Sequence, residues 1–193
     1  MRVLEPTPAL DSVTPAWHFP STLIDRLRLA DGREVVVRPV LAFDAAAAQD
    51  FVRALSPASR LRRFHFGLRE LPPTLLRAMT DVDHRQHVAI IAEAIDANDE
   101  ARIVADARYV VGPDPAEAEF GIAVADAWQG LGLGRTMMRR LARHAARHGV
   151  KRLVGDVLPD NAAMRAITDA LGGRLVRSPD GTGVLRARFD LRA

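Results

Sequence analysis

Three alternating glycines mark the middle of the chain, in the run QGLGLGR from Gln129 to Arg135. Glycine leaves the backbone uncovered, so successive N–H groups can close around phosphate oxygens. Apolar residues at helical spacing follow over 134–148, and a helix starting there directs its unpaired N–H groups and positive dipole end at the same anion. The pattern predicts a phosphate-binding turn between a strand and a helix, with the charge of Arg135 nearby.

Two common phosphate motifs do not describe this turn. Residues 135–137 supply no third glycine for the dinucleotide-binding spacing G-x-G-x-x-G, and the G-K-[ST] ending of a P-loop is missing. The remaining alternative is a flexible turn whose glycines serve packing. His144 and His148 on the following helix have the spacing of metal ligands but no Glu between them, so a solvent-exposed helix face is the preferred interpretation.

The elements around the turn predict a mixed α/β (α+β) sheet. Asp31-Gly32 between two apolar runs predicts a hairpin, and Ser56-Pro57 predicts a helix that starts with a serine N-cap. An antiparallel meander followed by strand–helix–strand units predicts a parallel crossover that interrupts antiparallel pairs. The longer strands are expected over 88–95, 103–111, 119–124 and 153–158, and the longer helices over 44–55, 134–148 and 160–171.

Composition narrows the class of protein. The 193 residues suit an extended, proline-bearing arm over 1–22 and a single domain over 23–193. The chain has no cysteine, no signal-peptide pattern, and no apolar run of the roughly 18 residues that a membrane helix needs, so we expect a cytoplasmic protein without membrane contact. Over 129–177, ten Lys or Arg stand against three Asp or Glu, which suits a polyanionic partner such as a nucleotide-like cofactor or a nucleic acid.

These motifs resemble a known family. The run Q-x-x-G-x-G at 129–134 is similar to the central signature of the GNAT superfamily of N-acetyltransferases, and NAAMRAITDALGG from Asn161 resembles its later helix. The resemblance spans roughly 35–189, and LSPASRLRRFHF and AEFGIAV look most like the catalytic domain of bacterial protein lysine acetyltransferases. It implies a mostly antiparallel central sheet flanked by helices, with a strand–loop–helix acyl-CoA site. The implied reaction moves an acetyl group from acetyl-CoA to a primary amine, protein lysine among the candidates, without a metal.

The resemblance also implies which residues hold acetyl-CoA. The backbone of a splayed strand would pair with the pantetheine arm, amides of the glycine turn would hold the pyrophosphate, and the later helix would add contacts. The Val124 amide would in addition polarise the thioester carbonyl. The implied cofactor-binding residues are Ile122, Ala123, Val124, Gln129, Gly130, Leu131, Gly132, Leu133, Gly134, Arg135, Asn161 and Arg165.

An amine must lose a proton before it attacks, so the implied reaction needs a base. Glu119 is the candidate, because it matches the family's acidic position and alternates with the small residues Gly121 and Ala123, which leave room for a cleft. A strand-edge glutamate facing water is the competing interpretation, and Glu93 is a second candidate. Many family members carry a tyrosine as general acid seven residues after the helix asparagine, where this chain has Thr168.

Three functions remain open from the sequence. The preferred one is an acetyl-CoA-dependent N-acetyltransferase, acting as a monomer or a homodimer. The second is a non-catalytic acyl-CoA-binding sensor or interaction module, which Thr168 favours. The third is a nucleic-acid-binding protein, suggested by the basic half but opposed by an aromatic content of only 5% and by the absence of a helix-turn-helix pattern.

Overall fold

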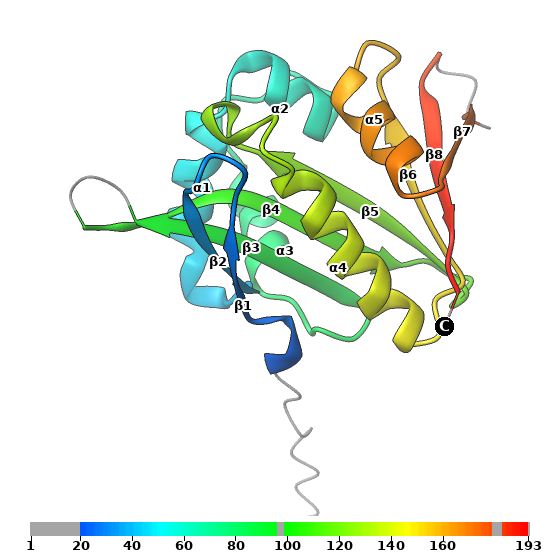
Figure 1. The fold of residues 1–193 in the computed structure, drawn as a ribbon, viewed down its shortest axis with the longest axis horizontal. Coiled ribbons are helices and arrows are strands. Elements are labelled where there is room, and N and C mark those ends of the chain that lie inside the picture. Colours follow the sequence, from blue (N-terminus) through cyan, green and yellow to red (C-terminus); the bar gives the residue numbers. More distant parts are fainter. Residues whose placement is uncertain (1–19, 96–98, 179–182, 193) are drawn as a thin grey trace, which may run out of the picture.

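The computed structural model describes residues 20–95, 99–178 and 183–192. Within these ranges one sheet carries helices on both of its faces (Figure 1). The strands are β1 (Asp25–Arg28), β2 (Glu34–Pro39), β3 (His87–Ile95), β4 (Ala101–Val111), β5 (Glu117–Val124), β6 (Arg152–Val157), β7 (Arg174–Arg177) and β8 (Leu185–Asp190). The α-helices are α1 (Ala45–Ala54), α2 (Pro57–Phe64), α3 (Pro73–Thr80), α4 (Leu133–Arg147) and α5 (Ala162–Ala170).

The predicted arm over 1–22 lies outside the described residues except for its last three: Pro20 caps a short 3₁₀ helix, Ser21–Leu23, which contains the other two. The division of the chain at residue 22 therefore stays a prediction. No helix within the described ranges is long and apolar enough to cross a membrane.

The sheet confirms the predicted mixture of strand directions. Its order is β1-β2-β3-β4-β5-β6-β8-β7, with β5 and β6 parallel and the other neighbours antiparallel. The predicted hairpin joins β1 to β2, and its Gly32 has a φ of +89°, a backbone conformation that favours glycine. The insertion of β8 between β6 and β7 had no signal in the local sequence pattern.

Strand β3 shows why helices cover both faces. Its residues Val88 and Ile90 enter the core under α4, whereas Ala89 and Ile91 enter the core under α1 and α3. A strand buried on both faces forms a continuous apolar run rather than an alternating one, which is the pattern of HVAIIAEAI. In Figure 1, α4 crosses the near face of the sheet and the first three helices lie behind it.

A buried polar pair lies between α4 and the sheet. The Tyr109 hydroxyl is hydrogen-bonded to His144 Nδ1 at 3.0 Å, and the His144 ring stacks on His148 with centroids 4.1 Å apart. His144 is only 6% exposed, so the solvent-exposed interpretation is wrong for this residue, because α4 presents it to β4. Burial, together with the neighbouring His148, lowers the pKa of His144 to about 4. Across the described ranges, no three His, Asp or Glu side chains group as a metal site.

We expect this histidine to destabilise the fold in acid. The folded protein keeps His144 neutral down to about pH 4, whereas an unfolded histidine binds a proton near pH 6.5. The unfolded state therefore binds more protons between these values, and the free energy of unfolding falls as the pH drops from 6.5 toward 4, by on the order of 3 kcal/mol from this residue. Urea titrations across this range should show a shallower pH dependence for His144→Gln.

The exposed His65 offers a control, because its φ of +62° is one that asparagine tolerates. His65→Asn should keep the wild-type pH dependence of stability. An equally steep dependence in His144→Gln would contradict the role given to the buried histidine.

Candidate functional site

A cleft of about 530 Å³ lies beside β5, between α2 and the first turns of α4 and α5. It is lined by Glu119 and by ten of the twelve residues implied to bind the cofactor. The two others lie outside the lining: Leu131 packs against the core under α4, and Arg165 is exposed, with a long 3.5 Å contact to the Pro159 carbonyl. The structure therefore gathers most of the predicted site into one cavity.

Strand β5 loses its partner β6 halfway along its length. The parallel ladder between them ends at Glu119 and Val154, whereas β4 stays paired with β5 as far as Val124. The two parallel strands diverge beyond Glu119, and the cleft occupies the side of β5 where they separate. The resemblance implies a splayed strand of this kind.

The β5 backbone faces this opening at alternate residues. The Ala125 N–H donates to the Val104 carbonyl on β4 at 2.8 Å. Because backbone groups alternate sides along a strand, those of Ile122 and Val124 point away from β4, toward the opening. The Val124 carbonyl accepts a hydrogen bond from Gln129 Nε2 at 3.0 Å. The Val124 N–H points to the same side of the strand, toward the cleft.

The glycine turn has a left-handed backbone at two of its three glycines. Gly130 and Gly132 have φ values of +75° and +81°, in the left-handed region that favours glycine. Gly132 is the N-cap of α4, so the unpaired N–H groups of the first helical turn begin at this point. Gly134 has a packing role instead, because an added Cβ would lie 3.2 Å from Ile167 on α5. The first two glycines fit a phosphate cradle and the third fits close helix contact.

An arginine from another segment contacts the residues directly before the glycine turn. Arg33, from the β1–β2 hairpin, lies over the Trp128 ring at 4.0 Å and donates to the Ala127 carbonyl at 3.0 Å. The sequence gave no sign of this contact, because the two segments meet only in the folded sheet. The hairpin therefore fixes where the turn begins.

Asp126 ties the turn to α2. It accepts hydrogen bonds from the Ser56 N–H at 2.9 Å and from the hydroxyls of Ser56 and Ser59 at 2.7 and 2.8 Å. Burial acts to raise the pKa of Asp126, but these hydrogen bonds lower it overall. Gln129 Nε2 also donates to the Ser59 hydroxyl at 3.1 Å. Ser56 is the N-cap of α2, as predicted, and it also fixes α2, one wall of the cleft, against the turn.

Helix α5 begins after Asn161, which matches the pattern of the GNAT superfamily, and contains Thr168, which departs from it. Asn161 caps the helix by accepting the Met164 N–H at 3.1 Å, and it lines the cleft. Thr168 is fully buried and donates to the Met164 carbonyl at 2.8 Å. Its methyl carbon would lie 2.9 Å from a Cβ added at Gly173. Thr168 faces the core rather than the cleft, so its hydroxyl is not placed to protonate a leaving group.

We therefore expect Thr168→Val to change turnover by no more than a few-fold. Valine has nearly the same shape, and the lost hydrogen bond is one to the backbone of the same helix, worth about 1 kcal/mol of stability. Thr168→Tyr should unfold or destabilise the protein rather than raise its activity, because the position has no room for a ring. Initial rates with the two variants, beside thermal melts, measure this, and a large fall in kcat for the valine variant would restore a chemical role to the hydroxyl.

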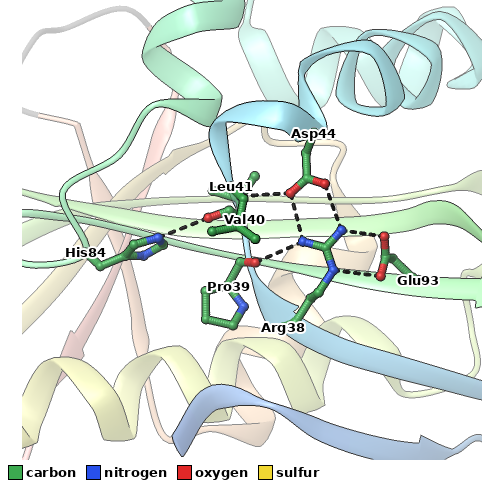
Figure 2. Close-up of polar contacts among 7 residues, drawn as sticks. All are labelled: Arg38, Pro39, Val40, Leu41, Asp44, His84 and Glu93. Atoms are coloured by element: carbon green, nitrogen blue, oxygen red, sulfur yellow. Dashed lines mark hydrogen bonds and ion pairs between the residues drawn. The ribbon is translucent and has the colours of Figure 1, made fainter. Parts of the chain in front are cut away.

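The two candidate bases lie in different surroundings. Glu119 is exposed and lines the cleft on the face of β5 that also carries Gly121. Both carboxylate oxygens of Glu93 accept hydrogen bonds from the Arg38 guanidinium, at donor–acceptor distances of 2.6 and 2.7 Å (Figure 2). Arg38 also binds Asp44 through two hydrogen bonds, and those with Asp44 and then Glu93 raise the pKa of its guanidinium. Glu93 is thus part of an ion-pair network that fastens β2 to β3, and it lies outside the cleft lining.

Comparisons with known proteins agree with this geometry. The model of the acetyltransferase (GNAT) family matches residues 56–172. An acetyltransferase of Pseudomonas aeruginosa is 36% identical over 152 residues, which cover 79% of this chain and 81% of that protein. Acetyltransferase Pat of Mycolicibacterium smegmatis is 32% identical over 167 residues, covering 86% of this chain but 48% of Pat. The solved GNAT domain of PAT from S. lividans superposes with a TM-score of 0.81 at 27% identity, over 90% of this chain and 99% of that domain.

Proposed function

This chain belongs to the acetyltransferase (GNAT) family, and from that premise we propose that it moves the acetyl group of acetyl-CoA directly to a primary amine, with Glu119 as general base. The observation that carries the proposal is the divergence of β5 from β6 directly after Glu119, which puts a carboxylate at the head of an opening lined by β5 backbone groups. We also propose that it acts in the cytoplasm.

The cofactor would lie along the cleft with its phosphates on the glycine turn. The left-handed backbone at Gly130 and Gly132, the first-turn amides of α4 and the charge of Arg135 suit a pyrophosphate. The pantetheine arm would pair with the backbone groups of Ile122 and Val124, as an added strand pairs with a sheet edge. Asn161 would contact the cofactor from α5, while Ala123 would leave space by its small side chain.

The acceptor amine would enter beside Glu119. The carboxylate removes a proton from the ammonium, directly or through one water, and the neutral nitrogen attacks the thioester carbon. The Val124 N–H would then donate to the oxyanion that develops, and collapse to the amide would release the CoA thiolate and the second proton of the nitrogen, which passes to solvent. A thiolate is a tolerable leaving group near neutral pH, so solvent is sufficient to protonate it and Thr168 is not required.

The test is an acceptor panel with acetyl-CoA as donor. Lysine peptides, polyamines, aminoglycosides and free amino acids would be incubated with the protein, with CoA thiol release as the rate and mass spectrometry as the product assay. We expect catalytic thiol release matched by an N-acetylated product, and the resemblance favours lysine-type amines. Tight acetyl-CoA binding without turnover on any amine would instead indicate the sensor function that the sequence left open.

A further inference from the structure

An arginine with unsatisfied donors lies on the floor of the acceptor half of the cleft. Arg63, on the last turn of α2, has a side chain only 16% exposed, and it lines the cleft together with Glu119. In the part of the chain that the structure describes, its five N–H donors make no hydrogen bond within the protein, and its Nε is fully buried without a partner. Leaving a buried donor without a partner costs free energy, and the part of the side chain that faces the cleft has donors free for a molecule that enters it.

The backbone of β5 is shaped around this guanidinium. A Cβ added at Gly121 would lie 2.7 Å from the Arg63 Cζ and within 2.9 Å of both terminal nitrogens. The guanidinium therefore lies flat against the strand at the one position where a side chain is missing. Glu119 precedes Gly121 by two residues and points to the same face, about 7 Å along the strand. The position of Arg63 is thus built into the site, beside the proposed base.

Arg63 does not have a carboxylate to itself among the charged groups around it. Its nearest carboxylate, Asp106, lies 3.8 Å away and is already bound by Arg108 through two hydrogen bonds, at 2.5 and 3.1 Å. Burial is the main cause that lowers the pKa of Arg63; Asp106 opposes it, Arg108 adds to it, and Glu119 opposes it. Two guanidinium groups therefore share one buried carboxylate, and Glu119, the other carboxylate that acts on Arg63, forms no ion pair with it within the described ranges.

We propose that Arg63 binds a carboxylate of the acceptor, so that the preferred substrates carry an amine and a carboxylate on one short chain. The inference rests on the proposed function, because it takes the amine to lie at Glu119. A carboxylate would give the terminal nitrogens of Arg63 the charge-assisted hydrogen bonds that the shared Asp106 does not supply. The carboxylate has two sources, a free amino acid or an acidic residue next to a lysine in a peptide.

The test compares acceptors that differ only in the carboxylate. One arm pairs lysine with cadaverine and 6-aminohexanoate with pentylamine, and the other pairs short peptides containing Lys-Asp with their Lys-Asn counterparts. For the wild type we expect kcat/KM to favour the carboxylate member by about 10- to 100-fold in at least one arm, which identifies the source. The Arg63→Gln variant should bring that ratio close to one.

Two further variants separate recognition from folding. Gly121→Ala keeps the arginine but displaces its guanidinium, so it should lower the same ratio. Arg69→Gln removes an equal charge from an exposed position outside the cleft lining and should leave the ratio unchanged. A purely structural arginine would lower the rates of both members of a pair together. Absence of a preference in the wild type, or a preference that survives Arg63→Gln, would overturn the proposal.

Calorimetry of the CoA-bound protein makes this result independent of turnover. Titration with 6-aminohexanoate and with pentylamine forms dead-end complexes in which no acetyl group is available. Arg63-dependent binding of the carboxylate without thiol release in any assay would refute the proposed function while supporting the subsite. Thiol release with no dependence on the carboxylate would do the reverse.

Discussion

Replacing Glu119 with glutamine is expected to lower kcat on the order of 10²-fold, the usual contribution of a positioned general base, with little change in acetyl-CoA affinity. Glutamine keeps the shape of the side chain but cannot accept the proton of an ammonium. The acidic limb of the pH–rate profile should also flatten, because the group that must be deprotonated is gone. Steady-state kinetics over a pH series, with calorimetry for the cofactor, measures all three quantities.

Glu117→Gln is the matched control. Glu117 is on the same strand two residues earlier, lies outside the cleft lining and forms an ion pair with Arg152 at 3.0 Å. Its loss should leave kcat within a few-fold of the wild type. Full turnover and an unchanged acidic limb in Glu119→Gln would show that Glu119 is an ordinary strand residue. Loss of acetyl-CoA binding in that variant would show that its role is structural.

Replacing Gly132 with alanine is expected to weaken acetyl-CoA binding by about 10- to 100-fold. A left-handed backbone costs a residue with a Cβ roughly 1–2 kcal/mol, so the turn should shift away from its φ of +81°. The shift would turn at least one amide out of the phosphate cradle, and each charge-assisted hydrogen bond to an anion is worth about that factor. Calorimetry with acetyl-CoA measures the affinity of the folded variant.

Gly149 provides the control for backbone strain. It follows α4 with a φ of +89°, and, as at Gly132, an added Cβ would meet nothing within 4 Å. Gly149→Ala should therefore lower the free energy of unfolding by a similar amount but leave acetyl-CoA affinity intact. Equal affinities in the two variants would mean that the glycine turn does not hold the cofactor.

Local patterns were sufficient to predict the elements and the turn. The turn between β5 and α4, the hairpin at Gly32 and the N-cap at Ser56 each depend on residues that are close together in sequence. The parallel crossover also followed, because a helix between two strands constrains their directions. Each of these features has a signal in the local sequence, and the structure contains each of them.

Contacts between segments far apart in the chain could not be predicted from local sequence patterns. The stacking of Arg33 on Trp128 and the placing of Arg63 on Gly121 depend on how the hairpin and α2 lie against β5, which no local spacing encodes. The burial of His144 depends on which face of α4 meets Tyr109. The sequence presented Gly121 as a small residue that leaves room, and the structure shows that an arginine fills that room.

A structure of the protein with CoA bound is the most direct test of where the cofactor lies in the cleft. We expect the pyrophosphate to lie on the amides that follow Gly130, the pantetheine arm to run beside Ile122 and Val124 where β5 has left β6, and the thiol to end near Glu119. A cofactor bound elsewhere, or bound in this cleft with its thiol directed away from Glu119, would contradict this expectation.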